Sequence, residues 1–150
     1  MKVKIEISQD DPCEVIIKCR EITDEVIRIQ ALLSGQNTAE LPLSIGDDEY
    51  FVPIKDILFF ETSGGRVYAH TRERMYLAPY KLFEIEDMMG ASFLRISKST
   101  VVNVMQIASL HRELTGSGEI RFKRSDKRTY FSRGYAKILK CRIEEMRFGR

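Results

Sequence analysis

The chain has 150 residues, of which 43% are hydrophobic, and a formal net charge of +2, as expected of a globular protein with its own core. No apolar run approaches the roughly 20 residues of a membrane span, and charges at every second position of residues 2–6 exclude a signal peptide. We therefore expect a cytoplasmic protein with no membrane partner. The three cysteines have no C-x-x-C spacing, which indicates neither a disulfide framework nor a zinc site.

Residues 1–45 are predicted to form a small β-β-α unit. Alternating residues at 2–7 and a β-branched run at 14–19 predict two strands. A threonine followed by two acidic residues at 23–25 predicts the start of a helix, and apolar residues keep helical spacing over 26–33. Two strands and one helix bury little surface, so we expect the unit to pack on the main body or on another copy of itself.

Residues 46–150 are predicted to form a main domain built mostly of strands. Short apolar runs separated by turn residues predict strands at 50–54, 57–61, 66–71, 75–78, 94–96, 100–102, 107–110, 119–123 and 129–131. One helix is predicted to begin at Pro79 and to end at Gly90, and a second, amphipathic helix to begin after Ser132. The predicted fold class is therefore α+β, dominated by antiparallel strands.

The charge is unevenly distributed. Residues 112–150 hold 12 basic and 5 acidic residues, whereas residues 1–111 hold 12 basic and 17 acidic residues. Such asymmetry indicates an anionic partner for the basic part, although a basic C-terminal helix can also be merely solvated.

Three cations stand at the ends of predicted elements, next to small or polar residues. Arg66 follows a Gly-Gly hairpin turn, Lys98 lies in a turn between two serines, and Arg133 follows the serine that precedes the last helix. Each alone is most simply a solvated surface charge. Together they predict loops on a β scaffold that offer cations and hydroxyls to a polyanion. The candidate residues are Gly65, Arg66, Ser97, Lys98, Ser99, Ser132 and Arg133.

Catalysis has little support in the sequence. His70 and His111 have no nucleophile or carboxylate at motif spacing, and the chain contains no H-E-x-x-H, G-x-S-x-G or Walker motif. The Gly-Gly pair lacks the third glycine of a dinucleotide site. We expect neither a cofactor nor a small-molecule substrate.

The chain resembles a LytTR-type DNA-binding domain. The matching residues are Ile57-Leu58-Phe59-Phe60-Glu61, Arg66-Val67-Tyr68, the run from Phe93 to Asn103, Ile107 and Phe131-Ser132-Arg133-Gly134-Tyr135. The resemblance covers residues 46–146. It implies an elongated arrangement of antiparallel sheets with short helices, in which loops enter successive major grooves of double-stranded DNA. It also assigns DNA contact to the Gly65-Arg66 hairpin, to Lys98 and to Arg133.

The length suggests which members of the family the chain resembles. Only about 45 residues precede the matching region, too few for a phosphorylatable receiver domain of roughly 120 residues, so the chain resembles stand-alone members. We expect a sequence-specific, homodimeric bacterial transcription regulator in which the three cationic loops meet at one edge. The alternatives are a protein-interaction or dimerisation module without direct DNA readout and, less well supported, a small enzyme.

Overall fold

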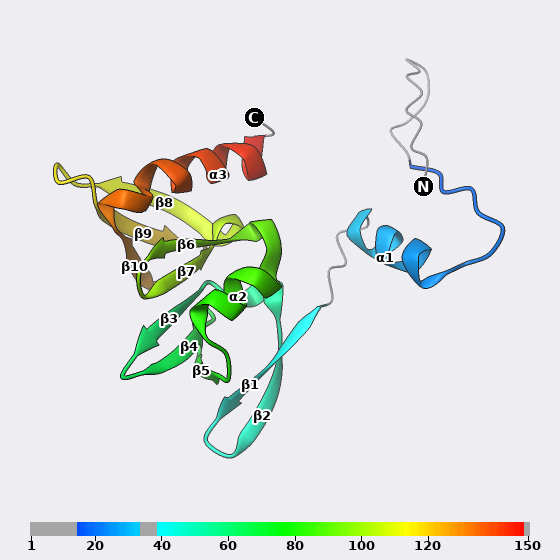
Figure 1. Cartoon of the computed structure of the whole chain (residues 1–150), viewed down its shortest axis with the longest axis horizontal. Coiled ribbons are helices and arrows are strands. Elements are labelled where there is room, and N and C mark those ends of the chain that lie inside the picture. The colour runs from blue at the N-terminus through cyan, green and yellow to red at the C-terminus, as the bar shows by residue number, and fades with distance from the viewer. Residues whose placement is uncertain (1–14, 34–38, 149–150) are drawn as a thin grey trace. The chain divides into compact units, whose positions relative to one another are not determined.

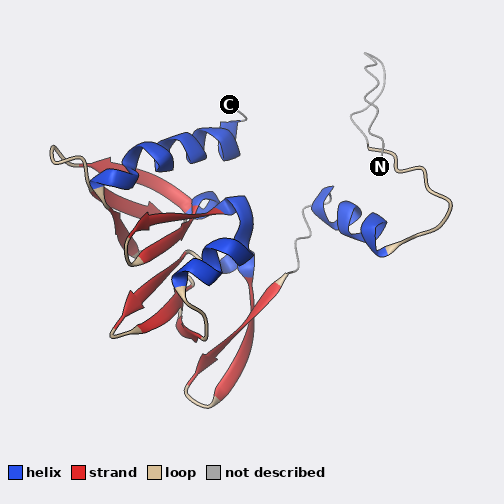
Figure 2. Ribbon diagram, in the orientation of Figure 1, coloured by secondary structure: helices blue, strands red, loops and turns tan. Residues whose placement is uncertain are grey.

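The computed structural model describes residues 15–33 and 39–148 and divides the chain into two compact units, Met1–Asn37 and Thr38–Arg150. The elements are α1 (Asp24–Leu33), β1 (Glu40–Ile45), β2 (Asp48–Pro53), β3 (Phe59–Ser63), β4 (Arg66–His70), β5 (Met75–Ala78), α2 (Leu82–Met89), β6 (Phe93–Ser97), β7 (Thr100–Asn103), β8 (Ile107–Arg112), β9 (Gly118–Phe122), β10 (Arg128–Phe131) and α3 (Ala136–Phe148). The predicted fold class is confirmed: β-strands dominate, and a small helix precedes the main unit (Figures 1 and 2). Among the described residues, no helix is long and apolar enough to cross a membrane.

In the first unit, the predicted helix is present and the predicted second strand is not. Thr23 Oγ1 accepts a hydrogen bond from the Val26 backbone N–H at 3.4 Å, as expected of a residue that caps α1. Residues 15–19 are irregular, because nothing in the described part of the chain pairs with them. The strand predicted at 2–7 lies outside the described residues. None of the described residues of α1 is buried.

The main unit contains two antiparallel sheets. The larger has the strand order β2-β1-β5-β4-β3-β7-β6, and the smaller has the order β10-β9-β8. The unit begins at Thr38, before the predicted boundary at residue 46, because β1 pairs along its whole length with β2. The sequence did not predict β1, because it contains Pro42, which has no backbone N–H to donate to a neighbouring strand. Pro42 is tolerated because β1 meets β5 only at Ser44.

The large sheet has a hydrophobic core on each face. Neighbouring residues of a strand point to opposite faces, and Phe60 and Val101 therefore join one core while Phe59 and Val102 join the other. The first core includes Ile85 of α2. The second core lies between the large sheet, the small sheet and α3, and contains residues of all three.

α2 starts later than predicted. It begins at Leu82, after an extended Lys81 whose backbone N–H donates to Glu84 Oε1 at 3.3 Å, so Pro79 precedes the helix. Gly90 follows α2 with φ at 70°, a conformation that suits glycine, and the predicted end of the helix is confirmed.

Candidate nucleic-acid interface

Two of the predicted cationic turns lie at the same end of the large sheet. Gly64 and Gly65, with φ at 58° and 77°, form the two-residue turn from β3 to β4, just before Arg66. β3 pairs antiparallel with β4 on one side and with β7 on the other, so the β6–β7 turn lies next to the β3–β4 turn. The backbone N–H of Thr62 donates to the carbonyl oxygen of Ser99 at 2.8 Å and joins the two turns.

The third cationic segment reaches this end from the small sheet. Gly118, the first residue of β9, pairs with Phe131, the last residue of β10, so the β8–β9 loop lies beside Ser132. The Ser132 backbone N–H donates to the carbonyl oxygen of Ile96 at 2.9 Å and joins this segment to β6.

We call this end of the two sheets the loop edge, made of residues 63–66, 97–100, 113–117 and 132–133. Its four segments lie along the left side of the main unit in Figure 1. All seven predicted site residues belong to it; Ser97 is half-buried and the other six are exposed.

Arg95 holds the turn that carries Lys98. Its Nε donates to the carbonyl oxygen of Ser97 at 2.8 Å, one terminal nitrogen donates to the carbonyl oxygen of Lys98, and the other donates to Glu86 Oε2 of α2 at 2.9 Å. The Ser99 backbone N–H also donates to Ser97 Oγ at 3.3 Å. The turn backbone is therefore fixed while the Lys98 side chain extends into solvent. We refer to these three Arg95 contacts as the Arg95 clamp, which no pattern in the sequence predicted.

Arg133 is exposed, but the prediction that it begins the last α-helix is wrong. The backbone N–H of Tyr135 donates to the carbonyl oxygen of Ser132 at 3.0 Å, closing the 3-10 turn η4 (Arg133–Tyr135). Within the described residues, the Ser132 side chain makes no capping hydrogen bond, and α3 begins at Ala136. The stem of Arg133 lies against the β8–β9 loop, since a Cβ on Gly116 would stand 2.9 Å from Arg133 Cγ.

The family model described as the LytTr DNA-binding domain matches residues 47–144, about two thirds of the chain. The chain belongs to the LytTR DNA-binding domain family. This family is defined by DNA binding and is not an enzyme class.

Curated relatives and a solved structure agree with this membership. The LytTR-domain chain is 34% identical to an uncharacterized HTH-type transcriptional regulator of Staphylococcus aureus strain bovine RF122 over 100 residues, which are 66% of this chain and 67% of that protein. It is 32% identical over the same length to a protein of the same description from strain NCTC 8325, with the same coverage of both chains. A LytTr DNA-binding domain from Bacillus cereus has the same fold, with a TM-score of 0.65 at 22% identity, over 70% of this chain and 96% of that domain.

The opposite end of the LytTR domain contains a cluster of half-buried titratable side chains. His70 Nε2 lies 2.7 Å from Glu61 Oε1, and the imidazole stacks on Phe59 with ring centroids 4.3 Å apart. Burial lowers the pKa of His70 below its usual range; nearby Glu61 opposes this shift, and nearby Lys127 adds to it. Burial also lowers the pKa of Lys127, whose Nζ donates to the carbonyl oxygen of Arg74 at 2.8 Å.

Hydrogen bonds from two side chains join the sheets at this opposite end. Lys127 of the β9–β10 turn donates to the carbonyl oxygen of Arg74 in the β4–β5 turn. Arg72 of the β4–β5 turn donates through Nε to the carbonyl oxygen of Lys123 at 2.9 Å and through a terminal nitrogen to Gln106 Oε1 at 2.7 Å. The small sheet is therefore attached to the large one at both of its ends.

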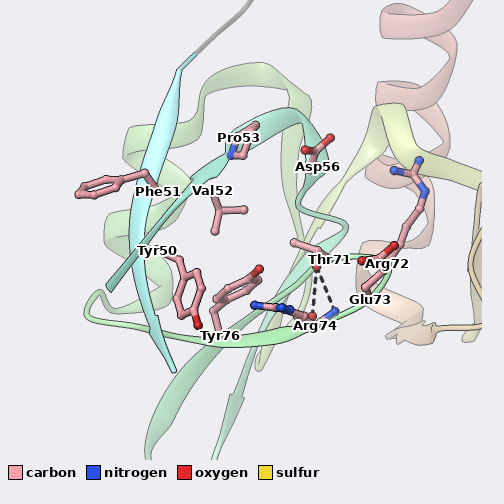
Figure 3. A pocket seen from close by; sticks show the side chains of 10 residues that line it. All are labelled: Tyr50, Phe51, Val52, Pro53, Asp56, Thr71, Arg72, Glu73, Arg74 and Tyr76. Carbon is pink, nitrogen blue, oxygen red and sulfur yellow. Dashed lines mark hydrogen bonds between the residues drawn. The ribbon is translucent and has the colours of Figure 1, made fainter. Parts of the chain in front are cut away.

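An open depression of about 480 Å³ lies beside the β4–β5 turn, away from the loop edge (Figure 3). The Arg74 guanidinium stands 5.5 Å from the ring centroid of Tyr50, which meets Tyr76 edge-on with centroids 5.6 Å apart. Hydrogen bonds between Thr71 and Arg74 close the β4–β5 turn. Across the described residues, no group of three or more His, Cys, Asp or Glu side chains could hold a metal ion.

Proposed function

We propose that this chain is a sequence-specific transcription regulator that binds double-stranded DNA with its loop edge in the major groove. The observation that supports this best is the meeting of Arg66, Lys98 and Arg133, three cations far apart in the sequence, at one end of two sheets. Phosphates and base edges are the ligands expected for exposed guanidinium and ammonium groups on a rigid scaffold.

The spacing of the strands suits one face of a duplex. The β3–β4 and β6–β7 turns are centred two strands apart in the order β4-β3-β7-β6. Strand spacing makes this roughly 10 Å, which fits within the roughly 12 Å width of the major groove. The α-helices are separated by strands throughout the described residues, so loops are better placed for base contact than a helix pair.

Each cation has a proposed role. Arg133 binds guanine, because its planar guanidinium can donate two parallel hydrogen bonds to O6 and N7. Lys98 and Arg66 bind phosphate or guanine, and Ser97, Ser99, Ser132 and the Gly65 backbone lie close enough to these cations to contribute further hydrogen bonds to DNA.

The test starts with selection of bound fragments from genomic DNA by the purified full-length chain, followed by mobility-shift titration. Arg133→Ala should cost about 1–3 kcal/mol on the selected site and relax the preference for one base. Lys98→Ala should reduce the salt slope by about one if Lys98 contacts phosphate. Lys55→Ala, the same charge change at the other end of β3, is the matched control and should leave affinity unchanged.

The proposal fails if Arg133→Ala and Lys98→Ala bind the selected site as wild type does. Failure to enrich any DNA fragment, together with salt-independent capture of a protein, would favour the protein-interaction module instead.

We further propose that the chain acts in the bacterial cytoplasm as a homodimer on repeated sites, and that the N-terminal unit mediates self-association. A ten-residue helix is marginally stable alone in water, and α1 exposes Ile27, Leu32 and Leu33. Sedimentation equilibrium of the full chain should give a dimer, and the double variant Ile27→Glu/Leu33→Glu should give a monomer. A monomeric wild type would refute this role.

A further inference from the structure

The β8–β9 loop presents a leucine at its tip. The loop is closed by hydrogen bonds from the Glu113 N–H to the carbonyl oxygen of Ser117 at 2.9 Å and from the Gly116 N–H to the carbonyl oxygen of Glu113 at 3.0 Å. The Thr115 and Ser117 hydroxyls lie 2.9 Å apart. Leu114 stands on this ordered turn with a relative exposure of 110%, so its side chain makes almost no contact with the protein.

The position of Leu114 matters more than its exposure, since single exposed apolar residues are common on protein surfaces. The loop belongs to the loop edge and projects there beside the start of α3 (Figure 1). Gly116, two residues after Leu114, packs against the stem of Arg133. Two residues span at most about 7 Å between their Cα atoms, so the backbone of Leu114 lies close to the stem of Arg133.

A leucine in the major groove has one apolar group to meet. The edges of the four base pairs present hydrogen-bond donors and acceptors there, together with the 5-methyl group of thymine. The leucine side chain has no polar atom and cannot form hydrogen bonds with these donors and acceptors. Contact with the thymine methyl removes apolar surface of both partners from water.

We propose that Leu114 is a specificity residue that contacts the 5-methyl group of a thymine close to the guanine bound by Arg133. This inference rests on the proposed function. It adds the β8–β9 loop to the three cationic segments as a fourth DNA-binding segment, and one that recognises shape and methyl groups without charge.

The test combines a variant with a change in the DNA. Each thymine near the Arg133 contact in the selected site is replaced in turn by deoxyuridine, which lacks only the methyl group. Wild type should lose about fourfold in affinity at one of these positions, the factor expected for one buried methyl-sized group. Leu114→Ala should lose about fourfold on the thymine site and should show no further loss on the uracil site. Phe51 is also an exposed apolar residue, but it lies on β2, so Phe51→Ala should bind the thymine site and the uracil site as wild type does.

Equal affinity of Leu114→Ala and wild type for the thymine site would overturn the inference. An equal loss on the thymine and uracil sites would also overturn it and would indicate that Leu114 contacts something other than a methyl group. In either case Arg133→Ala and Lys98→Ala still report on the proposed function, which stands if these variants lose affinity and fails if both bind as wild type does. Thermal unfolding of Leu114→Ala at the wild-type temperature excludes loss of fold, because its side chain has no packing to lose.

Discussion

Arg95→Lys tests whether the Arg95 clamp fixes the β6–β7 turn. Lysine retains the positive charge and can keep one of the three contacts, but it lacks the planar fork that reaches both turn carbonyls and Glu86 at once. The change therefore removes two hydrogen bonds from a charged donor without changing the net charge.

The structure sets the expected size of the effect. Hydrogen bonds from charged groups contribute about 1.5–3 kcal/mol each when buried, but the side chains of Arg95 and Glu86 are 25% and 36% exposed. A partly exposed ion pair contributes at most about 1 kcal/mol. We therefore expect Arg95→Lys to lower the free energy of unfolding by about 1–2 kcal/mol and Glu86→Gln, which removes only the ion pair, by less than about 1 kcal/mol.

Urea unfolding followed by circular dichroism measures the stability, and Arg121→Lys is the matched control. Arg121 also donates to a carboxylate, that of Glu119 at 2.9 Å, but it spans no turn. In DNA titrations, Arg95→Lys should also reduce discrimination against base changes near Lys98 more than Glu86→Gln does. Wild-type stability and wild-type discrimination in Arg95→Lys would refute the clamp.

Three further predictions concern the folding of the main unit. Because burial lowers the pKa of His70, the unfolded chain binds a proton at a higher pH than the folded chain, and the free energy of unfolding should fall as the pH drops below about 6.5. Urea titrations between pH 7 and 5 should show a flatter profile in His70→Gln, and an unchanged profile would contradict this. A Cβ on Gly118 would stand 2.1 Å from a backbone oxygen of β8, so Gly118→Ala should lower the free energy of unfolding by about 1–3 kcal/mol. Gly134 has open space around it in the described structure, so Gly134→Ala should leave the stability unchanged or raise it slightly. Thermal unfolding of both variants measures the difference. Asn103 is buried and donates to the carbonyl oxygen of Ile57 at 2.9 Å. Asn103→Leu leaves that oxygen unpaired and should lower the free energy of unfolding by about 2–4 kcal/mol. A urea midpoint equal to that of wild type would disprove this.

Local patterns were enough to predict most of the main unit. Alternation placed β5 at its observed bounds, and Gly64-Gly65 and Gly90 marked a turn and a helix end because their conformations require glycine. The seven predicted site residues could be grouped because each lies where a strand or helix ends, which is visible along the chain.

Long-range contacts account for what was missed. The strand β1 tolerates Pro42 because it meets β5 only at Ser44, and the run at 14–19 has strand-like residues without a partner in the described chain. The Arg95 clamp joins a strand to a helix, and the contact between Gly116 and Arg133 joins two segments that only the β9–β10 pairing brings together. Spacing along the sequence carries no signal for either.

Attachment of the small sheet at both ends restricts how the protein can meet a duplex. Ser132 is bonded to Ile96 at one end, and Lys127 and Arg72 are bonded across the sheets at the other, so neither sheet can swing about a single hinge. If the loop edge binds DNA as proposed, its fixed dimensions require any mismatch with the duplex to be taken up by bending or twisting of the base pairs. Operators with flexible pyrimidine–purine steps should then be preferred even at positions that no side chain touches.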